Sequence, residues 1–323
     1  MLREIWQQFF PPKPTFTEKD VGSQLGKVFI VTGANQGIGF ELVKMLYSTG
    51  ATIYLAGRSQ ERVQNAIAQI TSISPLPNTP AILKYLHLDL SDLAAVKAAA
   101  ATFAAQEQEL HILWNNAGTG YPKGSATKQG IESHIGANCV APLLFTQELL
   151  PLLQVAAKNS PKNSNSVRVI WTGSVQIEMS APKGGIDFGL INTGATTSTF
   201  VDYAASKVGN WFLADEASKR WGKQGIINVC ENPGNVYTNI YANEPWWFVT
   251  ILRLFILYEA KFGAYTMLYA GFSPDVTLEN NGTYIWPWGK VQPNARGDIY
   301  QAIAAGKAAE FWEWCEAKYK PYA

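Results

Sequence analysis

The chain has 323 residues, of which 47% are hydrophobic and 16% are charged, so it supports a large buried core and is not a disordered chain. The 26 basic and 25 acidic residues leave a formal net charge of +1. Because there is no strong positive field to gather a phosphate backbone, we expect no nucleic acid among the partners of this protein.

The first 24 residues are interpreted as an N-terminal arm, because the proline-rich residues 11–14 mark a segment that precedes the first regular element. The arm carries charge early and lacks the apolar stretch and small-residue cleavage site of a signal peptide. Three cysteines without CxxC spacing and three widely separated histidines predict neither a disulfide framework nor a metal site. We therefore expect a cytoplasmic protein.

An alternation of strands and helices begins at about Lys27. Short apolar runs predict buried strands at 27–33, 51–57, 82–90, 109–118 and 166–174. Apolar residues at helical spacing predict a helix over 37–48, and a serine cap with a charged first turn predicts another over 59–70. This alternation predicts an α/β fold, a Rossmann-type doubly wound parallel sheet in three α/β/α layers, as a single domain over residues 25–323.

A doubly wound sheet binds its ligand beyond the carboxyl ends of the strands, so we examined the residues that follow each strand. The first strand runs into a glycine-rich turn that opens a helix, and this turn is a candidate site for the pyrophosphate of a dinucleotide. The residues assigned to it are Gly33, Asn35, Gln36, Gly37, Ile38 and Gly39. The spacing is GxxxGxG, not the common GxGxxG, so the assignment depends on its place between strand and helix.

The second strand ends at Gly57 and Arg58, where an NAD-binding protein would place an acidic residue. A guanidinium suits bidentate contact with a phosphate, so Arg58 predicts NADP(H) as the cofactor. The ends of the third and fourth strands offer further cofactor contacts, namely Asp89, Leu90, Asn115, Ala117 and Gly118. Taken singly, these residues are equally typical of turns and helix caps.

Tyr203 and Lys207 lie one turn apart on one face of a predicted helix that ends near Gly222. A tyrosine hydroxyl is a weak base at neutral pH unless a nearby cation favours the phenolate, and Lys207 would supply that cation. The pattern is not specific by itself, because random placement supplies roughly one such pair in a chain of this composition.

Several motifs follow one another along the chain. They are Thr32-Gly33-x-x-x-Gly37-Ile38-Gly39, Asp89, Asn115-Asn116-Ala117-Gly118, Asn138, Ser174, Tyr203-x-x-x-Lys207 and Pro233-Gly234-x-Val236-x-Thr238. In this order, over residues 25–290, the chain resembles the short-chain dehydrogenases/reductases. Its arm and later segments also resemble the fungal alcohol-dehydrogenase-like and retinol-dehydrogenase-like branch. Members of that branch often belong to biosynthetic gene clusters, so the resemblance implies fungal secondary metabolism.

The resemblance implies a catalytic tetrad of Asn138, Ser174, Tyr203 and Lys207. Tyr203 would be the general acid or base, and Ser174 would hydrogen-bond the same substrate oxygen. Lys207 would also hold the nicotinamide ribose, and Asn138 would hold a water that links Lys207 to solvent. Contacts with the nicotinamide end of the cofactor are implied for Tyr203, Lys207, Pro233, Gly234, Val236 and Thr238.

Two segments longer than in compact family members are assigned to the substrate side. Residues 175–202 carry glycines and few charges, which predicts a loop that walls the pocket. Residues 239–262 predict a lid that presents apolar side chains to a bulky substrate, or alternatively an interfacial helix on a membrane surface. The apolar side chains are Trp246, Trp247, Phe248 and Leu252. Arg253 interrupts the run, which is shorter than the roughly 20 residues of a bilayer span, so we expect no transmembrane helix there.

These observations predict an NADP(H)-dependent oxidoreductase that interconverts a ketone or aldehyde and an alcohol on a hydrophobic small molecule. Two alternatives stay open: a non-redox cyclase, dehydratase or epimerase that uses the same fold, and a non-catalytic dinucleotide-binding protein. Peripheral membrane contact is less favoured than the lid. The resemblance also implies a homodimer formed through the helices that carry Asn138 and Tyr203.

Overall fold

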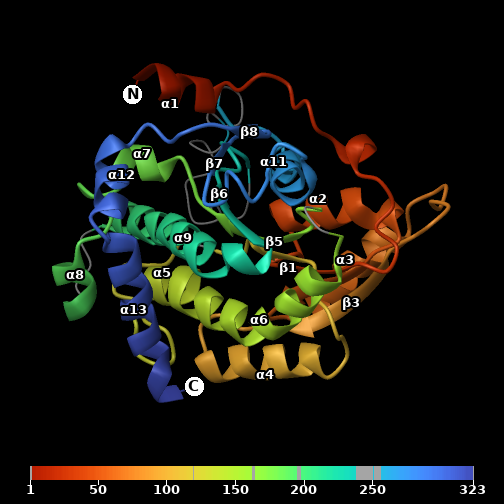
Figure 1. The fold of residues 1–323 in the computed structure, drawn as a ribbon, viewed down its shortest axis with the longest axis horizontal. Coiled ribbons are helices and arrows are strands. Elements are labelled where there is room, and N and C mark those ends of the chain that lie inside the picture. Colours follow the sequence, from red (N-terminus) through yellow and green to blue (C-terminus); the bar gives the residue numbers. More distant parts are fainter. Residues whose placement is uncertain are drawn as a thin grey trace.

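A central eight-stranded sheet organises the computed structural model, which describes residues 2–118, 120–161, 164–194, 198–237, 250 and 256–322 (Figure 1). The strands follow the order β3-β2-β1-β4-β5-β6-β7-β8, and every neighbouring pair is parallel except β7 with β8. Their bounds are β1 Val28–Thr32, β2 Thr52–Gly57, β3 Ile82–His87, β4 Ile112–Asn115, β5 Val167–Thr172, β6 Ile226–Glu231, β7 Tyr284–Trp286 and β8 Lys290–Val291. The predicted Rossmann-type doubly wound sheet is confirmed.

Helices cover both faces of the sheet and complete the three predicted layers. One apolar core joins the sheet to α2, α3 and α11, and the other joins it to α4, α6 and α9. The helices are α1 Leu2–Phe9, α2 Gly37–Leu46, α3 Gln60–Thr71, α4 Leu93–Ala104, α5 Ser133–Ile135, α6 Ala141–Asn159, α7 Gln176–Ser180, α8 Phe188–Thr193, α9 Thr199–Trp221, α11 Ala260–Phe272, α12 Gly297–Ala304 and α13 Lys307–Tyr319. Short 3₁₀ turns lie at Glu18–Asp20, Tyr47–Thr49, Gly222–Gln224 and Lys320–Tyr322.

Local sequence signals account for several of these boundaries. The Ser59 hydroxyl accepts the backbone N–H of Arg62 at 3.3 Å and caps α3, as predicted. The Asp92 carboxylate caps α4 in the same way through the N–H of Ala94. Strands β3 and β4 are shorter than predicted, so Leu88 to Leu90 and Asn116 to Gly118 lie in loops at the carboxyl edge of the sheet.

The helical stretch Ser133–Asn159 is long and apolar enough to cross a membrane, by length and composition only. Within the fold, 61% of its apolar window is buried, and α6 packs against α4. The stretch is interrupted by a π-helical segment, Gly136–Val140, which carries Asn138. We interpret it as a core helix.

Two expectations about the connecting segments were wrong. The N-terminal arm does not precede all regular structure, because α1 forms ahead of the prolines and lies beside α7 (Figure 1). Residues 175–202 are not a plain loop, because they contain α7, α8 and the start of α9. Residues 239–249 and 251–255 of the expected lid, including Trp246, Trp247, Phe248 and Leu252, lie outside the described residues.

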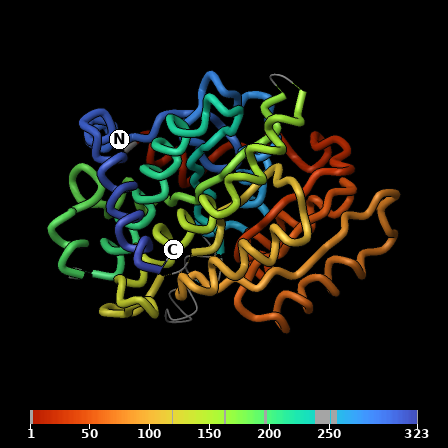
Figure 2. The backbone as a smooth tube through the Cα atoms, turned by 60° about the horizontal axis from the view of Figure 1, so that its bottom comes forward, coloured from red at the N-terminus to blue at the C-terminus, as the bar shows by residue number. Residues whose placement is uncertain are grey.

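The C-terminal helix α13 lies along α9 in both backbone views (Figure 2). Its fully buried Phe311 and Trp312 pack against Phe212 and Trp221 of α9, with ring centroids 6.3 and 5.3 Å apart. Glu316 accepts a hydrogen bond of 2.7 Å from Gln147 of α6. The chain therefore covers part of its own α6 and α9 surface.

Candidate active site

The turn between β1 and α2, residues 33–39, forms a backbone cradle in which three positions require glycine. Gly33 and Gly37 have φ angles of 68° and 60°, which are strained for residues with a Cβ. A Cβ on Gly39 would lie 2.9 Å from the carbonyl oxygen of Gly33. Helix α2 begins at this cradle without a side-chain cap from Gln36, and the N–H groups of a first helical turn suit an anion, so the geometry of the cradle fits a pyrophosphate.

The end of β4 is tied to this glycine turn through Thr32. The Thr32 hydroxyl accepts the N–H of Ala117 at 2.8 Å, and the Asn116 amide donates to the Thr32 carbonyl at 2.6 Å. Asn115, in contrast, turns its amide toward α6 and donates to the Thr146 hydroxyl at 3.0 Å. The side chain of Asn115 is therefore occupied by α6, and a cofactor contact at this position would involve its backbone. Asn116, which stands in the quoted motif without an assigned role, joins the end of β4 to β1.

Arg58 and Asp89, the residues predicted to contact the adenosine half of the cofactor, both influence the hydroxyl of Tyr121. Burial raises the pKa of Tyr121. The positive charge of Arg58 lowers this pKa and the negative charges of Asp89 and Glu132 raise it, so all three charges lie within electrostatic reach of the Tyr121 hydroxyl. Arg58 is exposed at the end of β2. Asp89 already accepts the N–H and hydroxyl of Ser91 through one oxygen, as a turn residue does. Leu90 is partly buried beside the core, and Asn35 lies near Gly57.

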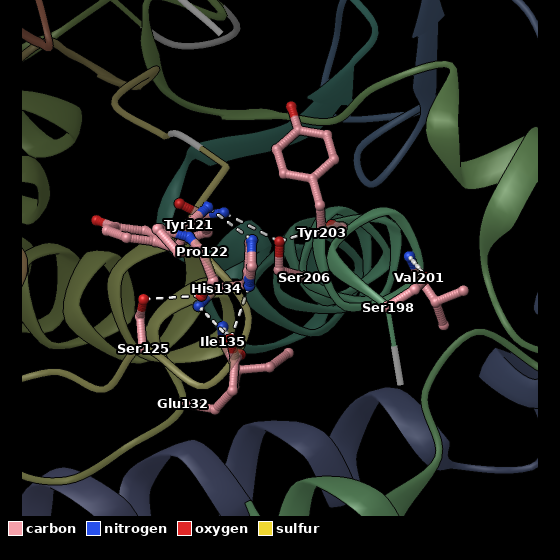
Figure 3. Close-up of polar contacts among 11 residues, drawn as sticks. Tyr121, Pro122, Ser125, Glu132, His134, Ile135, Ser198, Val201, Tyr203 and Ser206 are labelled. Atoms are coloured by element: carbon pink, nitrogen blue, oxygen red, sulfur yellow. Dashed lines mark hydrogen bonds and ion pairs between the residues drawn. The ribbon is translucent and has the colours of Figure 1, made fainter. Parts of the chain in front are cut away.

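Helix α9 presents Tyr203 and Lys207 from one face. Its start is fixed by Ser198, whose hydroxyl accepts the N–H of Val201 at 3.3 Å (Figure 3). The Lys207 ammonium is 5.6 Å from the centre of the Tyr203 ring and donates to the Thr172 carbonyl at 2.9 Å. Lys207 is 3% exposed and Tyr203 is half-buried. A buried ammonium thus lies directly beside the proposed acid–base tyrosine.

Asn138 and Gly118 complete this cluster from two other elements. The Asn138 amide donates to the Ser206 hydroxyl at 3.0 Å, and that hydroxyl donates to the Tyr203 carbonyl at 2.7 Å. A Cβ on Gly118 would lie 3.1 Å from the Lys207 ammonium and 3.3 Å from the Asn138 side-chain oxygen. The structure therefore brings Gly118, a predicted cofactor contact, next to Asn138 and Lys207 of the predicted tetrad.

Ser174 follows β5, one residue beyond Gly173, and is half-buried. Its hydroxyl oxygen accepts the N–H of Gln176 at 3.2 Å, which places it at the start of α7. Among the described residues this hydroxyl donates to no other group, so its hydrogen can serve a substrate oxygen. Ser174 and Thr172, the carbonyl partner of Lys207, come from the same strand end.

A buried carboxyl that sequence reasoning missed lies under this cluster. Glu231 ends β6 and pairs in register with Thr172 of β5. It is 0% exposed, and neither of its carboxyl oxygens is in a well-formed hydrogen bond among the described residues, although the Thr172 hydroxyl lies close by. Burial raises the pKa of Glu231 to about 8, while Thr172 and the positive charge of Lys207 lower it.

A second missed group is His134, which packs edge-on to Tyr203 with ring centroids 6.4 Å apart (Figure 3). Its Nε2 accepts the backbone N–H of Tyr121 at 2.8 Å, so its Nδ1 carries the proton and donates to Glu132 at 2.7 Å. Burial raises the pKa of Glu132, but the hydrogen bonds from His134 outweigh it, and the net pKa is lowered. The imidazole thereby links the loop after β4 to the Tyr203 ring.

The predicted nicotinamide segment follows β6. Gly234 has φ +81°, and a Cβ there would lie 3.1 Å from Pro287, so the turn needs glycine after Pro233. Val236 is buried and pairs with Tyr258, whose ring lies 4.7 Å from that of Trp288. Thr238 lies outside the described residues.

Two chemical features of the described residues bear on the other sequence expectations. All three cysteines are buried thiols, and none forms a disulfide. Within the described ranges, no group of three or more His, Cys, Asp or Glu side chains is placed to hold a metal ion.

Comparison with known proteins gives a consistent result. Residues 27–186 match the family model described as short chain dehydrogenase. The chain is 61% identical over 323 residues to short-chain dehydrogenase/reductase iacJ of Pestalotiopsis fici, with 99% of each chain covered. It is 41% identical to a short-chain dehydrogenase/reductase of Phomopsis amygdali, covering 99% of this chain and 98% of the relative. The fold is similar to that of NADPH-bound carbonyl reductase from chicken fatty liver, with a TM-score of 0.62, 23% identity, and 86% and 97% coverage.

Proposed function

Because this chain belongs to the short-chain dehydrogenase/reductase family and is thus an oxidoreductase, we propose that it uses NADP(H) to interconvert a ketone or aldehyde and an alcohol on a hydrophobic small molecule. The observation that carries this proposal is the convergence of Tyr203, Lys207 and Asn138 beside Gly118, at the carboxyl edge of the sheet and next to the glycine cradle. A protein that only bound a dinucleotide would have no need of a buried ammonium beside a half-exposed phenol.

The proposed mechanism gives each side chain one task. In carbonyl reduction, Tyr203 donates its hydroxyl proton to the carbonyl oxygen, while Ser174 donates a hydrogen bond to the same oxygen. Lys207 stabilises the resulting phenolate through its positive charge, and in alcohol oxidation the phenolate takes the proton back. The bound nicotinamide supplies or accepts the hydride at carbon. Asn138 holds the helix face that carries Tyr203 through Ser206. We also assign it the water that links Lys207 to solvent: after a reduction, Lys207 passes a proton to the Tyr203 phenolate and regains one from this water.

The residues around the cradle support NADP(H) over NAD(H). Arg58 stands at the end of β2 with an exposed guanidinium, where a carboxylate would be needed to bind the ribose hydroxyls of NAD. The neighbouring Gly57 carries no side chain beside Arg58, and a Cβ there would lie 3.2 Å from Val63 and 3.6 Å from Asn35. The 2′-phosphate would therefore pair with Arg58.

Exposed apolar side chains support a hydrophobic substrate. Met179 on α7 and Phe200 on α9 are 53% and 62% exposed, and both belong to the segment 175–202 that was assigned to the substrate side. Large exposed apolar groups in such positions favour an apolar ligand. The similar proteins of Pestalotiopsis fici and Phomopsis amygdali come from fungi, which supports a fungal secondary metabolite as the substrate class.

The test is to follow NADPH absorbance while the purified protein is offered a panel of hydrophobic ketones, aldehydes and alcohols. We expect one NADPH consumed for each alcohol formed, and a much weaker reaction with NADH. Product formation without any change in NADPH would instead favour the non-redox cyclase, dehydratase or epimerase. Binding of NADPH without turnover of any compound would favour the non-catalytic alternative.

A further inference from the structure

Gln8 of α1 is buried between two segments of the proposed active site. It is 1% exposed, although it lies on an eight-residue helix at the start of the chain. Its amide nitrogen donates to a carboxyl oxygen of Glu178 at 2.7 Å, and its amide oxygen accepts from the side chain of Asn232 at 2.8 Å. One side chain thus bridges positions that are 170 and 224 residues away in sequence.

Both partners of Gln8 belong to segments that the proposed function uses. Glu178 lies in α7, on the substrate-side segment that begins after Ser174. Asn232 immediately precedes the Pro233-Gly234 turn, and its side-chain oxygen accepts the N–H of Gly234 at 3.0 Å. The orientation of the Asn232 amide is therefore fixed at one end by Gln8 and at the other by the nicotinamide turn.

The substrate-side segment is held from its other side by the C-terminal region. The Asn294 amide donates to the same Glu178 oxygen at 2.8 Å. The Arg296 guanidinium donates to the carbonyls of Ile177, Ala181 and Pro182 at 2.8 to 3.1 Å. With α7 fixed on that side, the bridge through Gln8 sets the position of the nicotinamide turn relative to α7.

We propose that Gln8 is a positioning residue of the active site and that α1 links the substrate-side segment to the nicotinamide turn. This inference rests on the proposed function, because it takes Gly234 and its neighbours to contact the nicotinamide end of the cofactor. It goes further in giving the N-terminal arm a role in cofactor and substrate binding.

Loss of the bridge should affect only the nicotinamide half of the cofactor. The two hydrogen bonds of the Gln8 side chain hold the nicotinamide turn in place. Their loss should weaken binding of the nicotinamide half about tenfold in Kd. The glycine cradle and Arg58 lie on other segments, so binding of the adenosine half should not change. A general loosening of the fold would weaken both halves alike.

The experiment compares Gln8→Leu with Gln7→Leu, which places the same side chain at an exposed position of the same helix. Calorimetry measures the Kd of NADP⁺ and of 2′,5′-ADP, which lacks the nicotinamide. We expect Gln8→Leu to raise the Kd of NADP⁺ about tenfold and to leave that of 2′,5′-ADP unchanged, with no effect of Gln7→Leu. Equal changes for both ligands, or none, would overturn the proposal.

A second measurement uses the unmodified protein and so does not depend on how well the variant folds. Since coupling between two parts of a molecule is reciprocal, NADP⁺ should slow backbone hydrogen exchange in Leu2–Phe9, and 2′,5′-ADP should not. Unchanged exchange in α1 on NADP⁺ binding would refute the link. If the unmodified protein binds neither ligand, the proposed function fails, which is a different result.

Discussion

Glu231 offers a prediction about stability that follows from one buried carboxyl. It is fully buried, without a well-formed hydrogen bond to either oxygen among the described residues, and burial raises its pKa from 4.5 to about 8 although the neighbouring Thr172 hydroxyl and Lys207 lower it. The folded protein therefore retains a proton that the unfolded chain releases near its ordinary pKa. Stability from this group is complete below pH 4.5 and is lost as the pH rises toward 8.

The size of the effect follows from proton linkage. While the folded state holds one proton more than the unfolded state, the free energy of unfolding falls by about 1.4 kcal/mol for each pH unit. Between pH 5 and 8 the loss attributable to Glu231 is thus about 4 kcal/mol at most. A glutamine side chain is similar in shape and does not titrate, so Glu231→Gln should remove this slope.

Urea unfolding at several pH values between 5 and 8 measures the difference. The comparison between Glu231→Gln and the unmodified protein cancels the other titrating groups, including Glu178, whose pKa burial raises to about 7. The comparison also cancels the contribution of His111. Burial lowers the pKa of His111 from 6.5 to about 4, so the folded protein loses stability through this group as the pH falls from 6.5 toward 4. If Glu231→Gln keeps the slope of the unmodified protein, the assignment of a buried, protonated Glu231 is wrong.

Three further predictions concern the cofactor, the catalytic cluster and the assembly state. Arg58→Ala should raise the KM for NADPH by about ten- to a hundredfold and hardly change that for NADH, and equal effects in steady-state kinetics would contradict the 2′-phosphate assignment. Gly118→Ala should lower kcat at least tenfold with little loss of Tm, because its methyl group would press on Lys207, and unchanged kcat would contradict this packing. Because α13 covers part of α6 and α9, we expect light scattering after gel filtration to give the mass of a monomer and not of the homodimer that the resemblance implies; a dimer would show that this cover leaves an interface.

Local patterns in the sequence predicted the elements that depend on neighbouring residues. The Ser59 cap, the glycine turn at Gly33 and Gly37, and the pairing of Tyr203 with Lys207 each rest on contacts within a few positions. The alternation of strands and helices then predicted the parallel sheet. These features need no knowledge of distant contacts.

Other features depend on partners far away in the chain and leave no local signal. Asn115 stands at the end of a strand, where a ligand-binding residue is expected, but its side-chain amide donates a hydrogen bond to Thr146 on α6 instead. Helix α1 is too short to be stable alone, so its formation depends on packing and on the bridge from Gln8 to Glu178. In the sequence His134 is an isolated histidine, and only the fold places it against Tyr203. The local signal for its hydrogen bond with Glu132 was that the two residues lie two positions apart.

The central claim is that Tyr203 supplies the proton in an NADPH-dependent reduction. The most direct measurement is kcat of Tyr203→Phe with a ketone that the unmodified protein reduces, with NADPH affinity measured on the same sample and the exposed Tyr322→Phe as control. We expect kcat to fall by about two to four orders of magnitude while the Kd of NADPH stays within about threefold, because only the hydroxyl is removed. Turnover by Tyr203→Phe at the rate of the Tyr322→Phe control would contradict the account.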